Sequence, residues 1–155
     1  MKILVTYKSK TGFTKKYAEW IAEELGCEAK DIKTVSYKDV SDCGLVIHGG
    51  WIFGGVISGF NKIKKMNPKN LIMFGVGYTP KDKVDLKQMI VANGVGEIPF
   101  FYYEGGTNPE KMGLAGRKMV EIVTKEKVVY KDNTNKADIE ELVKMAKNKI
   151  KELEG

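Results

Sequence analysis

Cysteine and histidine are scarce in this sequence of 155 residues. It has two cysteines, Cys27 and Cys43, with no Cys-x-x-Cys pair, and a single histidine, His48. These residues are too few to ligate a zinc ion or an iron–sulfur cluster. We therefore expect no metal centre and two reduced, partly buried thiols, as is usual for a cytoplasmic protein.

Long apolar runs are also missing. No stretch approaches the ~20 apolar residues that a membrane-spanning helix needs. The first apolar run, Ile3–Val5, is short, and no cleavage-type sequence follows it, so we expect no signal peptide and a cytoplasmic location. With 43% hydrophobic and 30% charged residues, the chain is predicted to form one domain over residues 1–155.

The charge balance is basic. Lysine and arginine number 26 against 20 acidic residues, which gives a net charge of +6. Nucleic-acid binding would fit such a charge, but the sequence has no helix-turn-helix pattern, no RNP-like strand and no zinc module. We predict no nucleic-acid partner and a solvated basic surface, with an anionic ligand, a redox partner or a lipid surface as alternatives.

Short β-branched and aromatic runs alternate with segments of helical periodicity. The apolar runs lack polar alternation, which indicates strands that are covered on both faces, as in a parallel sheet. Repeated βα units of this kind predict an α/β fold with a doubly wound parallel sheet. The predicted strands are Lys2–Tyr7, Glu28–Val35, Gly44–His48, Asn70–Gly75 and Glu97–Glu104.

Apolar residues at helical spacing predict the intervening helices. The link Ser36–Cys43 is too short for a full crossover helix. The helical stripes comprise Tyr17–Leu25, Val56–Ile63, Leu86–Ile90, Leu114–Val123 and Ile139–Leu153.

In open α/β sheets, ligands bind at the carboxyl ends of the strands. After the first predicted strand come Ser9, Thr11, Gly12 and Thr14, three hydroxyls and a glycine that lead into a helix. Unpaired first-turn amides, the positive end of the helix dipole and these hydroxyls suit a phosphate group. The alternative is an ordinary N-cap formed by Thr11 or Thr14.

Two further segments follow predicted strands. Gly49–Gly55 places Trp51 between two glycine pairs, which suits a loop that covers a flat ligand, although Trp51 and Phe53 could instead cover the core or a subunit interface. Gly75–Pro80 contains Tyr78, which could likewise cover a flat ligand; the alternative is that this segment is a plain turn. His48 ends the third predicted strand and is assigned no role.

Other phosphate-binding classes lack their motifs. The first loop has neither the GxxxxGK[ST] of P-loop proteins nor the GxGxxG of dinucleotide-binding domains. Receiver domains need acidic residues at the ends of the first and third strands, where this chain has Tyr7 and His48.

The pattern Ser-x-Thr-Gly-x-Thr after the first strand resembles the FMN-phosphate loop of the flavodoxin family. The resemblance implies a three-layer α/β/α fold with a five-stranded parallel sheet in the order 2-1-3-4-5, and FMN held without a covalent bond. It implies that the hydroxyls of Ser9, Thr11 and Thr14 and the amides of Lys10, Gly12 and Phe13 bind the phosphate.

The same resemblance implies that the second and third segments hold the flavin ring. One would cover a ring face and bond the N5 edge through its backbone, and Tyr78 would cover the opposite face. The implied residues are Gly50, Trp51, Ile52, Phe53 and Gly54 in the second segment, and Gly75, Val76, Gly77, Tyr78 and Thr79 in the third.

Two features distinguish this chain from electron-carrier flavodoxins, which are typically acidic. The chain is basic, and Glu97–Gly106 followed by Lys111–Gly113 resembles the small flavodoxin-domain proteins related to protoporphyrinogen dehydrogenases, which pass electrons to quinones. That resemblance implies a quinone- or porphyrin-type substrate in place of a redox partner protein. The basic, amphipathic segment Met112–Lys131 would then contact a membrane surface or an anionic substrate, or else pack on the core. A flavin-free phosphate- or partner-binding module remains the alternative from another class.

Overall fold

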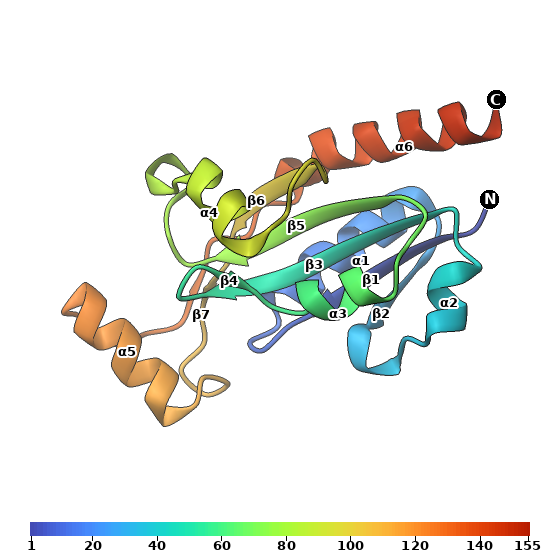
Figure 1. The fold of residues 1–155 in the computed structure, drawn as a ribbon. Helices are drawn as coiled ribbons and strands as arrows, with labels where there is room; N and C mark the ends of the chain where they lie inside the picture. Colours follow the sequence, from blue (N-terminus) through green and yellow to red (C-terminus); the bar gives the residue numbers. More distant parts are fainter.

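Five parallel strands form the main sheet of the computed structural model, which describes residues 1–155 (Figure 1). Their spatial order is β2-β1-β3-β5-β6, and the short β4 pairs antiparallel with β3. Leaving out β4, this is the predicted order 2-1-3-4-5, which is confirmed. The strands are β1 (Ile3–Lys8), β2 (Glu28–Asp31), β3 (Leu45–Phe53), β4 (Val56–Ile57), β5 (Leu71–Gly77) and β6 (Phe100–Glu104).

Helices follow most of the strands. The predicted stops Gly26 and Gly94 cap α1 and α4 in the left-handed conformation, with φ of 64° and 66°. No helix is both long and apolar enough to span a bilayer. The helices are α1 (Phe13–Leu25), α2 (Tyr37–Ser41), α3 (Phe60–Lys65), α4 (Leu86–Asn93), α5 (Leu114–Thr124) and α6 (Glu140–Glu154), with 3₁₀ turns at Ile32–Thr34, Lys81–Lys83 and Lys136–Ile139.

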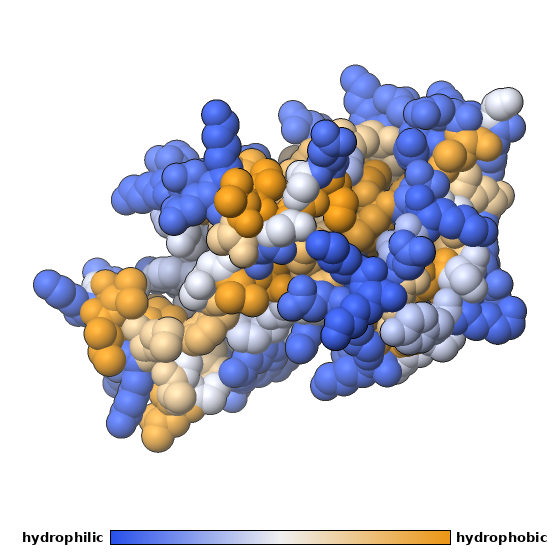
Figure 2. All heavy atoms as spheres, viewed as in Figure 1, coloured by the Kyte–Doolittle hydropathy of each residue, from blue (hydrophilic) through white to orange (hydrophobic).

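One segment leaves the layered body between β6 and α6. We call residues 106–131 the arm; it contains β7 (Gly106–Thr107), α5 and the start of β8 (Lys131–Asp132), which pairs antiparallel with β7. Helix α5 forms where the periodicity predicts it, but it stands away from the sheet and none of its residues is buried (Figure 1). Apolar atoms are therefore exposed over α5, at the lower left of Figure 2.

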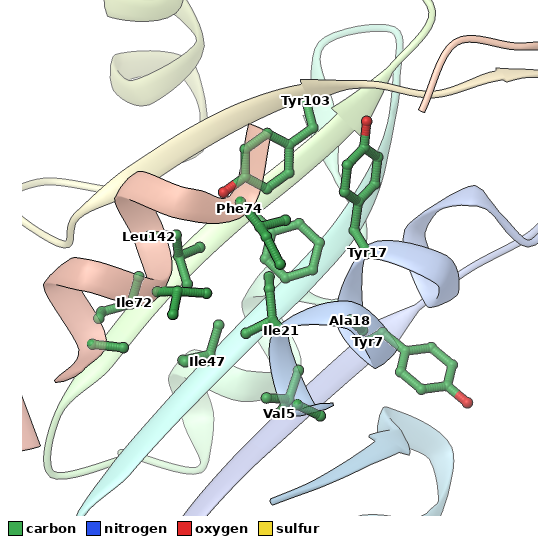
Figure 3. Packing of buried hydrophobic residues seen from close by; sticks show 14 of the residues in the cluster. Val5, Tyr7, Tyr17, Ala18, Ile21, Ile47, Ile72, Phe74, Tyr103 and Leu142 are labelled. Carbon is green, nitrogen blue, oxygen red and sulfur yellow. The ribbon is translucent and has the colours of Figure 1, made fainter. Parts of the chain in front are cut away.

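Two apolar cores fill the space on either side of the sheet. Val5, Ile47 and Phe74 face α1 and α6 (Figure 3), whereas the neighbouring Leu4 and Val46 pack against the layer that contains α2 and α3. Successive residues of a strand point to opposite faces, so a continuous apolar run is buried on both. This confirms the three-layer α/β/α architecture that the sequence predicts.

Two segments differ from the prediction. Val56 and Ile57 were expected to begin a helix, but they form β4, because Gly54 and Gly55, with φ of 57° and 80°, make a two-residue hairpin turn after β3. For the same reason the expected loop Gly49–Gly55 is strand as far as Phe53.

The predicted strand Glu28–Val35 is also shorter than expected, because its second half is a 3₁₀ turn. Within Ser36–Cys43 lies the short helix α2, stabilised by a capping box in which Ser36 Oγ accepts from Asp39 N and Asp39 Oδ2 accepts from Ser36 N.

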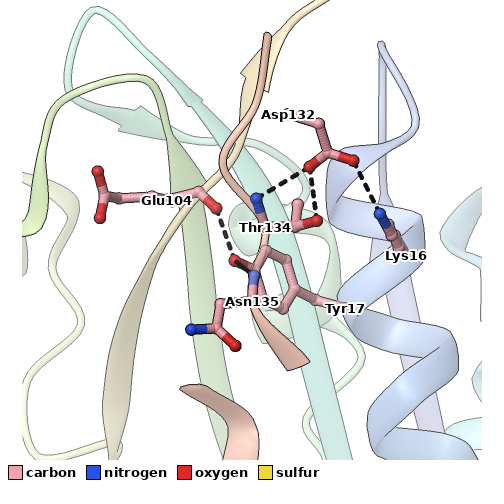
Figure 4. A network of polar contacts seen from close by, with 6 residues as sticks. All are labelled: Lys16, Tyr17, Glu104, Asp132, Thr134 and Asn135. Carbon is pink, nitrogen blue, oxygen red and sulfur yellow. Dashed lines mark hydrogen bonds and ion pairs between the residues drawn. The ribbon is translucent and has the colours of Figure 1, made fainter. Parts of the chain in front are cut away.

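The two ends of the arm are held together at the first turns of α1 (Figure 4). Tyr17 donates its hydroxyl to Glu104 O at 2.6 Å and accepts from Asn135 N at 3.2 Å. Lys16 Nζ pairs with Asp132 Oδ2 at 2.8 Å. These contacts connect the exit of the arm, after β6, to its return, before α6. The base of the arm is thus fixed to the same helix that follows the first loop.

Candidate cofactor-binding site

A cleft with a volume of about 660 Å³, counted out to its mouth, lies at the carboxyl ends of the strands, where the three predicted segments meet. Of the predicted site residues, the cleft is lined by Lys10, Thr11, Phe13, Thr14, Trp51, Ile52, Phe53, Val76, Gly77 and Tyr78.

The remaining predicted site residues do not line this cleft. Gly54 and Thr79 line an adjoining groove. Ser9 Oγ accepts from Gly12 N at 3.1 Å, so this pair shapes the loop from within. Gly50 and Gly75 allow close packing: an added Cβ would lie 2.1 Å from the Ser58 carbonyl oxygen and 2.6 Å from Ile52 Cδ1, respectively.

Part of the cleft wall was missed by the sequence analysis. Gly105, Gly106 and Thr107 directly follow β6, so the rule that located the other segments applies to them as well. Met112, Gly116 and Val120 come from the arm, and their spacing gave no sign that they face the cleft. Together these six residues complete the lining.

The first loop presents unpaired backbone donors to the cleft. Gly12, with φ of 100°, precedes α1 and provides no side-chain cap. The amides of Thr11, Phe13, Thr14 and Lys15 donate to no other group of the chain, and the first bond of the helix runs from Lys16 N to Gly12 O. Such a row of amides at the positive end of a helix dipole fits a phosphate group. Thr14 is only 2% exposed, and its side chain lines the cleft from within this turn.

Aromatic side chains form another part of the wall. Trp51 lies at the end of β3, beside Val76 of β5 in the sheet register. Its ring centroid is 5.5 Å from that of Phe53 and 5.7 Å from Lys10 Nζ. Tyr78 follows β5 and is 38% exposed. The cleft thus combines a phosphate-type cradle with rings on which a planar ligand can stack.

His48, to which the sequence gave no role, holds the hairpin that carries Trp51. Its Nε2 donates to Ser58 O at 3.1 Å, and Ser58 N donates to Trp51 O at 3.0 Å. At the tip of the hairpin, Asn93 accepts from Ile57 N at 3.0 Å and donates to Gly55 O at 2.8 Å. The position of the aromatic wall therefore depends on both residues.

The contacts of His48 also fix its tautomer. Because the Ser58 carbonyl can only accept, Nε2 carries the proton, and Nδ1 accepts from the Thr6 hydroxyl at 2.8 Å. Burial, which removes water from the charged form, lowers the pKa of His48 from 6.5 to about 4. His48 is neutral at physiological pH.

Comparison with known proteins agrees with this geometry. The flavodoxin-domain family profile matches residues 4–135, so the chain belongs to the flavodoxin-domain family. No curated protein matches the chain. The resemblance to the flavodoxin family is thereby confirmed, whereas the finer resemblance to protoporphyrinogen dehydrogenases stays a prediction.

Solved structures of flavodoxins and related flavoproteins are similar to this chain. A flavodoxin from the domain Archaea is 16% identical over 81% of this chain and 98% of its own, with a TM-score of 0.49. Flavodoxin 2 from Bacillus cereus is 17% identical over 81% of this chain and 100% of its own, with a TM-score of 0.47. The Flv1 flavodiiron core from Synechocystis sp. PCC6803 is 14% identical over 94% of this chain and 36% of its own, with a TM-score of 0.50.

The depressed pKa of His48 predicts a pH dependence of stability. Between pH 6.5 and about 4 only the unfolded chain takes up the proton, so the free energy of unfolding falls as the pH is lowered through this window. The loss amounts to at most about 3–4 kcal/mol at ~1.4 kcal/mol per pH unit. Urea unfolding at pH 7, 6 and 5 measures it.

His48→Gln is the matched variant for this measurement, because an amide can donate to Ser58 O and accept from Thr6 without titrating. His48 is the one histidine of the chain, so the slope above pH 5 should be smaller in the variant. An identical slope in both proteins would contradict the assignment.

Proposed function

We propose that the chain binds FMN without a covalent bond and takes part in electron transfer through it. The observation that carries this proposal is the row of unpaired amides at the start of α1, which opens into the same cleft as Trp51 and Tyr78. A dianionic phosphate and a planar ring are the two parts of FMN that such a cleft suits. When bound, FMN supplies the redox chemistry, and the protein supplies binding, orientation and electrostatics.

The residues divide into two sets by what they would hold. Amides of the first loop and the hydroxyls of Thr11 and Thr14 would bind the phosphate, with Ser9 keeping the turn in shape through Gly12. Trp51 and Tyr78 would flank the ring. The one titratable cation of the lining is Lys10, and no cluster of acidic, histidine or cysteine side chains could hold a metal. This lining suits electron transfer better than proton transfer.

The double variant Thr11→Ala/Thr14→Ala removes two hydroxyls from the phosphate cradle. Hydrogen bonds to charged groups contribute about 1.5–3 kcal/mol each, so the affinity for FMN should fall at least ~100-fold. Quenching of FMN fluorescence on titration with protein measures the dissociation constant.

The matched control is Thr34→Ala/Ser41→Ala, which removes two exposed hydroxyls on the segment around α2 and should leave FMN affinity unchanged. If the wild-type protein is colourless when purified and does not bind FMN at micromolar concentration, the flavin-free phosphate- or partner-binding alternative holds instead.

A second ligand could reach the cofactor through the adjoining groove. This groove, with a volume of about 1,550 Å³ counted out to its mouth, runs between the β3–β4 hairpin, α4 and α5. It shares Ile52, Phe53, Gly77, Tyr78 and Val120 with the cofactor cleft. Its other side chains include the apolar Met89, Met119 and Val123, and polar ones such as Lys83 and Gln88. This continuity favours a flat, apolar partner of the quinone or porphyrin type over a redox partner protein.

The arm offers a surface that suits a membrane. Leu114, Met119, Ile122 and Val123 are exposed on α5, the last two to 76% and 77%. Arg117, Lys118, Lys125 and Lys127 lie in the same stretch of the chain. Apolar side chains amid cations are typical of segments that rest on an anionic lipid surface. We propose that residues 112–131 make peripheral contact with a membrane, from which an apolar partner would enter the groove.

Vesicles of anionic lipid, with and without an incorporated quinone, test this proposal. The reduced FMN-loaded protein should sediment with both kinds of vesicle and should be reoxidised anaerobically by the kind that contains quinone. Ile122→Gln/Val123→Gln removes two apolar side chains without changing the charge, so it should weaken sedimentation strongly. It should leave FMN affinity unchanged, because neither side chain lines the cofactor cleft.

Failure to sediment would contradict the membrane contact. If the protein is not reoxidised by quinone and consumes no protoporphyrinogen, yet is rapidly reduced by a flavodoxin reductase, it is an electron carrier for a protein partner.

A further inference from the structure

Two of the lysines around the first loop are already paired. Lys15 Nζ is 3.8 Å from Glu19 Oε1, and Lys16 Nζ is 2.8 Å from Asp132 Oδ2. Lys10, which lies near Trp51, and Lys111 of the arm have no carboxylate within 4.0 Å. Lys10 of the body and Lys111 of the arm are therefore among the cations near the loop that no carboxylate offsets.

Lys111 is far from the loop in sequence but beside it in space. Its Nζ lies 3.9 Å from the position of a Cβ on Gly12, and it is the nearest atom to that position outside the immediate chain neighbours. Gly12 is the N-cap residue of α1. The ammonium group thus stands beside Gly12, the residue that directly precedes the unpaired amides of the first turn.

The backbone holds this part of the arm in place. Lys111 N and Met112 N both donate to Asn108 O, at 3.1 Å and 3.0 Å, so residues 108–112 form a closed turn. Thr107, which precedes this turn, is buried and donates its hydroxyl to Val129 O at 2.5 Å. Met112, at the end of the turn, lines the cofactor cleft.

The electrostatics of this arrangement are unfavourable unless an anion is bound. The N-terminus of a helix carries a partial positive charge, and a cation placed against it is destabilised by the same effect that stabilises an anion. Lys111 adds a full positive charge at that end of α1, with no carboxylate to offset it. A phosphate placed between the amides and the ammonium group would neutralise both.

We propose that Lys111 is a ligand of the cofactor phosphate, supplied by the arm, so that the phosphate bridges the arm and the first loop. This inference rests on the proposed function, because the phosphate is that of FMN. It assigns to the arm a role in cofactor recognition that is separate from its contact with a membrane. Riboflavin has the same ring and lacks the phosphate, so its affinity for the protein should not depend on Lys111.

The experiment compares Lys111→Gln with wild type in titrations with FMN and with riboflavin, each followed by flavin fluorescence. Loss of one charge-assisted contact at a partly solvated site should weaken FMN binding about tenfold. Riboflavin affinity should stay the same. Lys111→Arg should restore most of the FMN affinity, because a guanidinium also pairs with phosphate.

Lys118→Gln is the matched control: it makes the same charge change on the same arm, at an exposed residue that lines neither the cleft nor the groove. It should leave both affinities unchanged. Equal losses in the two variants would show a general effect of net charge, and parallel losses of FMN and riboflavin affinity would show a structural effect. Either result, or an unchanged FMN affinity in Lys111→Gln, would overturn the assignment.

These outcomes are distinct from failure of the proposed function. If wild-type protein binds FMN and Lys111→Gln binds it equally well, the role of Lys111 fails and the function stands. If wild-type protein binds no FMN, the proposed function fails, and the role of Lys111 fails with it.

Discussion

The site depends on one local constraint, the way in which α1 begins. Gly12 adopts a left-handed conformation that leaves the following amides without side-chain or backbone acceptors. Every α-helix leaves its first amides without intrahelical partners, and because no side chain caps them here, this turn can offer them to water or to a ligand. The remaining parts of the site, the aromatic hairpin and the arm, are positioned around the same end of the sheet.

Those other parts are held by contacts between distant segments. His48 and Asn93 fix the β3–β4 hairpin at its base and at its tip. Tyr17 and Lys16 fix the base of the arm to α1, which is the helix that follows the first loop. Body, hairpin and arm therefore meet at one edge of the sheet, which is where parallel α/β sheets bind their ligands.

The sequence predicted the layers of the fold because the apolar runs are unambiguous: a run such as Leu45–Ile47 can be buried on both faces only between two helical layers. It predicted the first loop because hydroxyls and glycine directly follow such a run. It failed at Val56 and Ile57, whose spacing to Phe60 and Ile63 imitates a helix although a glycine pair turns the chain into a hairpin. The sequence could not predict the position of α5, since the same periodicity occurs in a helix that packs on a core and in one that projects on an arm.

The central claim is that free amides at the start of α1 bind a phosphate. Titration of isotopically labelled protein with FMN, followed by proton–nitrogen correlation spectra, tests it most directly. The account predicts that the resonances of Thr11, Phe13, Thr14 and Lys15 move strongly downfield with FMN and little with riboflavin. A charged phosphate polarises N–H bonds more strongly than water does, and riboflavin has no phosphate. Equal shifts with both flavins, or no shift at these amides while FMN binds elsewhere, would contradict it.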